Sequence, residues 1–238
     1  RAARHGVLYR CLDRHAPWGG IIAIHPRQVA GFERAGYPAG LLHVLRNPAR
    51  PYCDTRVPAE TNHRLVYVGR LEEDKGVMDL VRSARRTGQP LRLIGDGALA
   101  RRIRRDHPEV ELAGWRSPDD MGALVRDARA LVVPSHHPEP FGLVIAEAVK
   151  SGLPVLVSQT GALAGDVERL GVGLAFDVFD PAAMDAAMTR MRDMAVDDLR
   201  RMSERGMTRG DALALTPAAW ADGLVALYAR ALAGAGDV

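Results

Sequence analysis

Cysteine is scarce in this chain of 238 residues, which contains only two. Cys11 and Cys53 form no C-x-x-C pattern, so the sequence predicts neither a disulfide framework nor a structural zinc site. Such sparse use of cysteine is typical of proteins in a reducing compartment, and we expect a cytoplasmic protein. No apolar run approaches the roughly 20 residues that a membrane-spanning helix needs, and residues 1–7 lead into no apolar core of a signal peptide.

A strong excess of one charge sign is also missing, because the formal net charge is only +3 with 26% charged residues. So small a balance does not predict a nucleic-acid partner. The densest basic cluster is Arg101, Arg102, Arg104 and Arg105, which we interpret as a solvated helix face. A membrane surface or an acidic partner stays open as the alternative for this cluster, and with it a peripheral membrane contact.

Several kinds of reactive site have no counterpart in the sequence. No D-x-D sequence occurs, which argues against a divalent metal on a diphosphate, and we predict no metal site. His136 and His137 are adjacent, and adjacent side chains of an extended segment point apart, so the two are not expected to bind one metal. Candidate nucleophiles such as Ser135 and Ser158 lack a His–Asp arrangement and a G-x-S-x-G turn, which excludes a serine hydrolase.

What the chain does contain is a series of short apolar runs, each ending in a turn residue. The runs cover residues 65–68, 91–94, 110–113, 131–133, 155–157 and 174–176. They are rich in Val and Leu, as buried parallel strands are. Helical patterns lie between them, at about 77–87, 98–106, 118–129, 142–151 and 162–170. The alternation predicts an α/β fold with a doubly wound parallel sheet, in which ligands bind beyond the carboxyl ends of the strands.

The rest of the chain has a different pattern. Residues 1–47 contain a helical stretch, a strand candidate at 21–24, a helix near 26–35 and a short run at 41–44, which is too little for an independent core. Residues 48–63 are rich in proline and are interpreted as a linker. The main domain is expected over 64–215, and a final helix begins at Thr216-Pro217 within 216–238.

Two carboxylates flank a predicted helix start in the sequence E-P-F-G-L-V-I-A-E. Glu139 and Glu147 stand eight positions apart, with a turn of small residues between them. A helix start offers unpaired N–H groups and the positive end of the dipole, which suit a phosphate. A carboxylate suits the hydroxyls of a sugar. The combination predicts a ligand with both groups, a nucleotide sugar.

A basic loop follows the first strand of the predicted sheet, in the sequence G-R-L-E-E-D-K-G. Arg70 leaves the strand and Lys75 precedes the next helix, so the two cations are candidates to neutralise a diphosphate. The alternative is local pairing of both cations with the acids at 72–74. Because Arg70, Gly95, Gly114, Ser135 and Glu139 all fall at the carboxyl edge, we favour the phosphate interpretation.

Gly95-Asp96-Gly97-Ala98-Leu99-Ala100 matches G-x-G-x-x-A, a loose form of the dinucleotide-binding motif. It follows the second strand of the domain, and the expected acid after the next strand is missing. We therefore predict no dinucleotide cofactor. These glycines are expected either to let the backbone approach a nucleotide or to form a tight turn.

The R-x4-K pair and the E-x7-E element together resemble the donor-binding domain of retaining GT-B glycosyltransferases of the family 4 type, over about residues 64–180. The resemblance implies that Arg70 and Lys75 hold the diphosphate and stabilise the leaving group, that Glu139 accepts hydroxyls of the transferred sugar, and that Glu147 accepts the ribose hydroxyls. It further implies donor contacts at Gly69, Gly114, Trp115, Phe141, Gly142 and Leu143.

The resemblance also implies a reaction: transfer of a hexosyl group from a nucleotide diphosphate sugar, UDP- or GDP-linked, with retention of configuration and without a metal. The acceptor, whether a sugar, a lipid or another small molecule, is not indicated. By the same resemblance residues 1–47 correspond to the end of an acceptor-binding domain, against which the final helix would pack. On this basis we expect the chain to bind nucleotide but to transfer poorly.

One loop departs from the family pattern. After the strand that ends at Ser158 the family commonly has two glycines and a glutamate, whereas this chain has Gly161-Ala162-Leu163-Ala164-Gly165-Asp166. Two alternatives to a transferase stay open at this point. One is a non-catalytic module that binds a nucleotide sugar, and the other is an epimerase or phosphorylase of similar build.

Overall fold

The computed structural model describes residues 20–234. They form two compact units, one made of residues 20–48 with 214–234 and the other of Ala49–Leu213. Cys11 and the helical stretch predicted before residue 20 lie outside the described residues. Within the described part, no helix combines the length and the apolar character needed to span a lipid bilayer.

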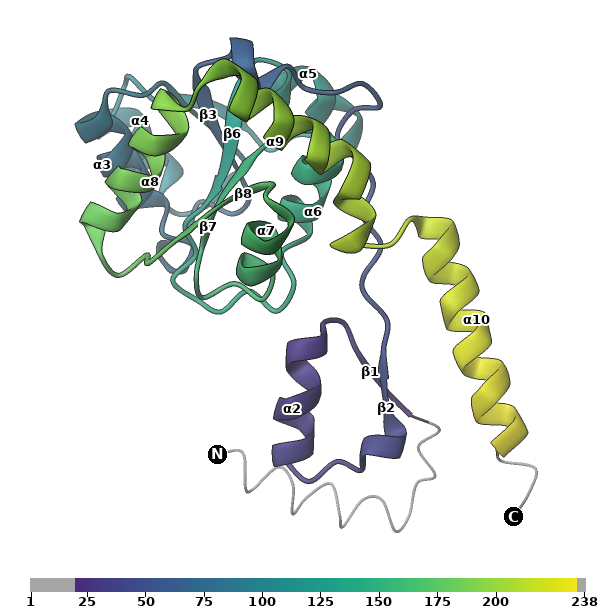
Figure 1. Ribbon diagram of the computed structural model, residues 1–238. Helices are drawn as coiled ribbons and strands as arrows, with labels where there is room; N and C mark the ends of the chain where they lie inside the picture. The colour runs from purple at the N-terminus through teal and green to yellow at the C-terminus, as the bar shows by residue number, and fades with distance from the viewer. Residues whose placement is uncertain (1–19, 235–238) are drawn as a thin grey trace. The chain divides into compact units, whose positions relative to one another are not determined.

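The larger unit is built on a six-stranded parallel sheet (Figure 1). Its strands are β3 (Arg64–Val68), β4 (Leu91–Ile94), β5 (Glu111–Gly114), β6 (Ala128–Val133), β7 (Val155–Ser158) and β8 (Gly173–Phe176). The order in the sheet is β5-β4-β3-β6-β7-β8. The strand order reverses between β3 and β6, so these neighbours mark the topological switch point of a doubly wound sheet. The predicted fold class is confirmed.

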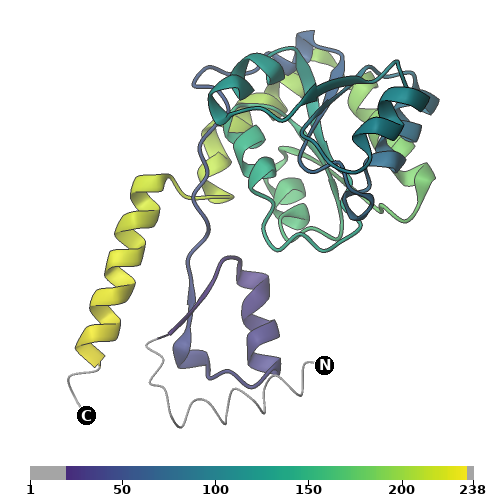
Figure 2. The same cartoon turned by 180° about the vertical axis from the view of Figure 1, so that it is seen from behind.

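Helices cover both faces of this sheet. They are α3 (Val77–Thr87), α4 (Ala100–Asp106), α5 (Met121–Val125), α6 (Leu143–Lys150), α7 (Ala164–Leu170), α8 (Pro181–Asp193) and α9 (Val196–Arg209). α3 packs against α8, whereas α9 packs against α6 and α7. Figures 1 and 2 show these two groups on opposite faces of the sheet. Leu80, Ile103 and Met188 come from α3, α4 and α8 and share one buried core with the strands.

The predicted helix over 118–129 is too long. Pro118–Asp120 form a 3-10 turn, α5 ends at Val125, and β6 begins at Ala128. Alanine and arginine favour helices locally, but tertiary contacts decide here. Arg129 is only 4% exposed, and its guanidinium donates to four backbone carbonyls, those of Asn62, Met191, Arg192 and Met194. This side chain closes the C-terminal end of α8 from within the strand.

The smaller unit contains β1 (Ile21–Ala23), α2 (Pro26–Arg34), β2 (Leu42–Val44) and α10 (Pro217–Gly234). β1 and β2 pair in parallel. The chain returns to this unit after Leu213, where the Leu215 N–H donates to the Asn47 carbonyl over 3.2 Å. The smaller unit therefore joins residues 20–48 with residues 214–234.

The sequence interprets residues 48–63 as a linker, but all of this segment except Pro48 is packed within the larger unit. Val57 and Ala59 are fully buried. Glu60 is also buried and forms a bidentate pair with Arg56, at 2.6 and 2.8 Å, and a longer contact with Arg200. These hydrogen bonds, chiefly those from Arg56, lower the pKa of Glu60 to about 2. The segment is tied to the domain by both packing and charge.

This buried carboxylate predicts a pH-dependent loss of stability. The pKa of Glu60 is lower in the folded chain than its ordinary value of 4.5, so its contribution is complete above about pH 4.5 and disappears as the pH falls toward 2. We expect Glu60→Gln to lower the free energy of unfolding by about 2 kcal/mol at pH 7. The difference should shrink steadily below pH 4.5 in urea titrations. A difference that stays constant down to pH 2.5 would contradict this assignment.

Candidate functional site

The loops that follow β3 and β6 meet at the switch point. The main-chain N–H groups of His136 and His137 both donate to the Asp74 carbonyl, at 3.0 and 3.3 Å. Gly76 adopts φ +67°, and a β-carbon there would lie 1.9 Å from the Pro134 carbonyl oxygen, so only glycine allows this approach. The two loops, far apart in sequence, therefore form one continuous surface at the carboxyl edge of the sheet.

The central contact of this surface is an ion pair between Lys75 Nζ and Glu139 Oε1. Both side chains are about one-fifth exposed (19% and 20%). Ser135 Oγ donates to the same carboxylate oxygen over 3.1 Å. Lys75 thus bypasses the neighbouring acids at 72–74, which the local-pairing alternative assigns to it, and reaches across the switch point. One ammonium group and one carboxylate are held side by side at the predicted site.

Arg70 lies in a more open setting. Its guanidinium is 67% exposed and stands 3.7 Å from the Asp74 carboxylate, so local pairing does occur for this cation, although weakly. Its main chain is fixed by Tyr67, whose hydroxyl donates to the Arg70 carbonyl over 2.7 Å. The backbone at Arg70 is therefore held in place, while most of its side chain is exposed to solvent.

The surroundings of Tyr67 relate the charged side chains of this surface to one another. Burial raises the pKa of this phenol well above its ordinary value, and the charges of Glu139 and Asp74 raise it further, while that of Arg70 opposes them. Glu139 and Arg70 therefore both lie within electrostatic reach of one hydroxyl group. Sequence reasoning missed Tyr67, because its position within an apolar run indicates only a core residue.

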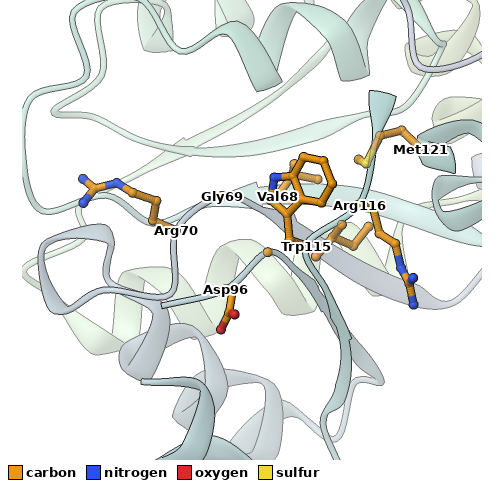
Figure 3. Close-up of a pocket in the computed structure, with 9 residues that line it drawn as sticks. Val68, Gly69, Arg70, Asp96, Trp115, Arg116 and Met121 are labelled. Carbon is orange, nitrogen blue, oxygen red and sulfur yellow. The ribbon is translucent and has the colours of Figure 1, made fainter. Parts of the chain in front are cut away.

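A pocket of about 300 Å³ opens at the carboxyl ends of β3, β4 and β5, beside this charged cluster. It is lined by Val68, Gly69, Arg70, Ile94, Gly95, Asp96, Trp115, Arg116 and Met121. Figure 3 shows the Trp115 indole in the middle of this lining, with Arg70 and Arg116 extending to opposite sides. Trp115 is 74% exposed. The pocket therefore has an exposed aromatic face among its lining residues, with two arginines at its edges.

The glycine motif at 95–100 contributes its first two residues, Gly95 and Asp96, to the lining of this pocket. A β-carbon at Gly95 would lie 1.9 Å from the Gly69 carbonyl oxygen, and the Gly95 N–H donates to the Gly114 carbonyl over 2.9 Å. The first glycine therefore allows adjacent loops to touch each other. Gly69 and Gly114, for which the family resemblance implies donor contacts, both lie where these loops touch.

The N-terminus of α6 lies in the same sequence segment as Glu139. Gly142 precedes the helix, and within the described residues no side chain caps its first turn. Phe141 is buried at 3% exposure, whereas Leu143 is 43% exposed. The first N–H groups of α6 are thus available to an anion.

Glu147 is the fifth residue of α6 and differs from Glu139 in its surroundings. Burial raises its pKa above the ordinary value, while a hydrogen bond with the Tyr52 hydroxyl opposes the shift. Tyr52 belongs to the segment that the sequence interprets as linker, and nothing in its sequence neighbourhood signals this contact. The structure places Glu147 beside Tyr52 and Glu139 beside Lys75.

Two features flagged in the sequence take clear positions. The divergent loop after β7 contacts the Glu139 segment through main chain, since the Ala162 N–H donates to the Glu139 carbonyl over 3.0 Å. His136 turns to α3, where its Nε2 lies 2.8 Å from the Asp79 carboxylate. In the part of the chain that the structure describes, no three His, Cys, Asp or Glu side chains are grouped as metal ligands.

Known proteins resemble this chain in sequence. The glycogen synthase of Mycobacterium tuberculosis is 35% identical over 167 residues, which is 63% of this chain and 39% of that protein. A D-inositol 3-phosphate glycosyltransferase of Nocardia farcinica is 32% identical over 187 residues, covering 71% of this chain and 40% of that protein. The chain therefore spans about two fifths of the length of these curated relatives.

Solved structures resemble it in fold. A sucrose-phosphate synthase from Thermosynechococcus elongatus superposes with a TM-score of 0.77 at 27% identity, over 90% of this chain and 58% of that one. HepE from Anabaena, solved in complex with UDP, gives a TM-score of 0.79 at 19% identity, over 96% of this chain and 68% of that one. At that identity the second likeness concerns the fold alone.

A family model extends over most of the larger unit. The model described as "Glycosyl transferases group 1" matches residues 62–193, which include the β3 loop with Arg70 and Lys75 and the segment from Glu139 to Glu147. This range is more than half of the chain. With the GT-B-like sheet and the charged cluster at its switch point, the match shows that this chain belongs to the group 1 glycosyltransferases.

Proposed function

We propose that this chain is the donor-binding part of a retaining glycosyltransferase that takes a hexosyl group from a UDP- or GDP-linked sugar. The observation that carries the proposal is the Lys75–Glu139 ion pair. It puts a cation for phosphate and a carboxylate for sugar hydroxyls next to each other. The bond that breaks in such a transfer is the one between sugar and phosphate. Lys75 would act on the phosphate side of this bond, and Glu139 on the sugar side.

The chemistry assigned to the site is charge stabilisation. As the glycosyl–oxygen bond breaks, negative charge grows on the departing diphosphate and positive charge on the sugar ring. Lys75, Arg70 and the first N–H groups of α6 would stabilise the departing anion, which lowers the barrier when these groups are fixed beforehand. Glu139 would hold the sugar by its hydroxyls. Retention of configuration is inferred from the E-x7-E resemblance.

Independence from metals follows in this proposal from the protein's own charges. Two side-chain cations and a helix N-terminus supply positive charge where a diphosphate would otherwise require a divalent ion. The expectation can be checked directly, because chelation with EDTA should leave the affinity for nucleoside diphosphate unchanged.

The nucleoside is assigned to the pocket beside Trp115. The indole face suits stacking on a base, and the pocket adjoins Arg70, so a base there would place its phosphates next to the cations. HepE from Anabaena has been solved in complex with UDP, which supports including UDP among the first ligands to be tried. The acceptor stays open.

The test is calorimetric titration with UDP, GDP, ADP and their glucose or mannose conjugates. We expect one of the uridine or guanosine pairs to bind at micromolar concentrations, and the corresponding nucleoside to bind far more weakly. Failure of every diphosphate to bind would overturn the proposal. Release of free nucleoside diphosphate from the selected sugar nucleotide then reports cleavage of the sugar–phosphate bond, with water taking the glycosyl group where no other acceptor is supplied.

Replacing Glu139 with alanine should separate binding from reaction. Without its carboxylate partner Lys75 is free to meet a phosphate, so affinity for the nucleoside diphosphate should stay the same or rise about threefold. Release of nucleoside diphosphate from the sugar nucleotide should fall at least tenfold, because the sugar loses a hydroxyl acceptor. Calorimetry and a release assay on the same samples check this. A variant that loses affinity but keeps its rate would count against the role of Glu139.

A further inference from the structure

A second pocket, of about 210 Å³, shares no lining residue with the pocket beside Trp115. It opens between α3, the loop after β6 and the loop that joins β8 to α8. α3 and α8 pack against each other on one face of the sheet (Figure 1). The pocket is smaller than the roughly 300–1,000 Å³ pockets that take drug-sized ligands, so it has room for a single ring and not for a nucleotide.

Part of the lining is apolar and includes an exposed ring. Val178 and Met184 are only 4% and 1% exposed, whereas Phe179 is 69% exposed. Single exposed apolar side chains are common on folded proteins, but this one belongs to the wall of a cavity. The Phe179 ring therefore offers a flat apolar surface to a molecule that enters the pocket.

The main chain that carries this ring is fixed by short-range hydrogen bonds. The Phe179 N–H donates to the Asp177 carboxylate over 2.9 Å, and the Asp180 N–H donates to the Asp177 carbonyl over 3.3 Å. The Asp180 carboxylate accepts from the Ala182 N–H over 2.9 Å and caps α8. The centroid of the His136 ring lies 5.6 Å from that of Phe179. The Phe179 ring is thus held through its backbone and flanked on one side, which lowers the cost of ordering it in a complex.

The polar part of the lining comes mainly from α3. Asp79, Arg82 and Arg86 follow each other at intervals of three and four residues, so they share one face of the helix. Asp79 pairs with Arg82, and His136 Nε2 lies 2.8 Å from the Asp79 carboxylate. Arg86 forms a bidentate pair with Asp185 of α8, at 2.7 and 2.8 Å. Two carboxylates therefore balance two guanidinium groups around the pocket.

This balance favours a neutral ligand with several hydroxyl groups. A guanidinium has five N–H donors and a carboxylate has about four acceptor sites. In its side-chain contacts within the described residues, Arg82 uses one nitrogen and Arg86 uses two. A phosphate would compete with Asp79 and Asp185 for these two cations. A hydroxyl group can instead join an existing ion pair, because it donates to the carboxylate and accepts from the guanidinium.

We propose that this pocket binds the pyranose ring of a neutral sugar, at a site separate from the pocket beside Trp115. A pyranose combines an apolar C–H face with neighbouring hydroxyl groups at its edge. The C–H face would pack on the Phe179 ring, and two hydroxyl groups would meet Asp79 and Arg82. The inference goes beyond the proposed function and does not rest on it, because it requires neither a nucleotide nor transfer of a sugar.

Methionine methyl groups can report on the two pockets separately, since Met184 lines this one and Met121 lines the pocket beside Trp115. The protein is labelled with carbon-13 at its methionine methyl groups and titrated with the methyl glycosides of glucose, mannose and galactose. We expect at least one glycoside to shift the Met184 signal at millimolar concentrations while the Met121 signal stays in place. Met184→Leu and Met121→Leu identify the two signals. Inorganic phosphate should leave Met184 unchanged.

Variants at Phe179 test the stacking surface. Phe179→Ala should weaken glycoside binding by at least about fivefold, whereas Phe179→Tyr keeps an aromatic face and should bind within about twofold of the unaltered protein. Val196→Ala is the control, because it shortens another exposed apolar side chain, on α9 and outside the lining. Unchanged signals from the remaining methionines show that each variant is folded.

A Met184 shift that saturates, is lost in Phe179→Ala and is kept in Phe179→Tyr supports the inference. It is overturned if none of the three glycosides shifts Met184, if phosphate alone does, or if Phe179→Ala binds as well as Val196→Ala. The proposed function is decided by other ligands. It fails when no nucleoside diphosphate binds in calorimetry, whatever the glycosides do at Met184.

Discussion

Lys75→Ala is expected to weaken the binding of a nucleoside diphosphate by about 1.5–3 kcal/mol while leaving the nucleoside unaffected. Lys75 is four-fifths buried and already paired, so its ammonium is fixed and partly shielded from water, where a contact with phosphate is strong. Its loss also leaves Glu139 unpaired beside the phosphate, and this repulsion adds to the effect. Arg70→Ala should cost less, near the lower limit, because that side chain is 67% exposed. Calorimetry with UDP or GDP and with the corresponding nucleoside measures both.

A double substitution isolates the effect of the Lys75–Glu139 ion pair on binding. Lys75→Ala combined with Glu139→Ala should bind the diphosphate more tightly than Lys75→Ala alone, because the unpaired carboxylate is gone. Arg104→Ala removes one charge from an exposed part of α4 and should change nothing. If Lys75→Ala weakened nucleoside and diphosphate equally, Lys75 would not be a phosphate contact.

Arg129→Met should destabilise the fold by about 4 kcal/mol. Arg129 is 4% exposed, and its guanidinium donates to the Asn62 carbonyl and to carbonyls in and just after the last turn of α8, at 2.8–3.2 Å. A methionine fills most of the volume but leaves these buried carbonyls without donors, and each unsatisfied group costs about 1–3 kcal/mol. Because the positive charge also sits at the carboxyl end of α8, its loss removes a favourable interaction with the helix dipole.

Urea unfolding followed by circular dichroism checks this expectation. Arg190→Met is the matched control, because Arg190 is exposed on the same helix and its loss should change stability by less than about 0.5 kcal/mol. Arg129→Lys keeps the charge but has fewer donors in a different geometry, so an intermediate loss is expected. Equal stability of Arg129→Met and Arg190→Met would show that the carbonyl contacts contribute little.

The order of strands and helices in the larger unit could be predicted from the sequence because each short apolar run ends at a turn residue. The runs at 91–94 and 155–157 correspond closely to β4 and β7. The region around Arg129 could not be predicted, since a charged residue in a buried strand is disfavoured unless distant carbonyls satisfy it. Local patterns carry no information about partners more than 60 residues away.

The same limit applies to the candidate site. Parallel strands bring their carboxyl ends to one edge, so sequence alone indicates that Arg70, Lys75 and Glu139 share an edge. The ion pair between Lys75 and Glu139 could not be predicted in the same way. The two residues are separated by 63 others, and three acids that could pair with Lys75 stand immediately before it. Tyr67 and Tyr52 were beyond prediction, because each acts through a hydroxyl whose partner is set by tertiary structure.

The two main-chain hydrogen bonds onto the Asp74 carbonyl have a consequence for how the site tolerates change. They are made by peptide groups, so they survive when side chains at positions 74, 136 and 137 are exchanged. The spacing between the ammonium and the carboxylate is therefore encoded in the polypeptide backbone itself. Exchanges of side chains on these turns can therefore vary the surface around the proposed site while the spacing between the two charged groups is kept.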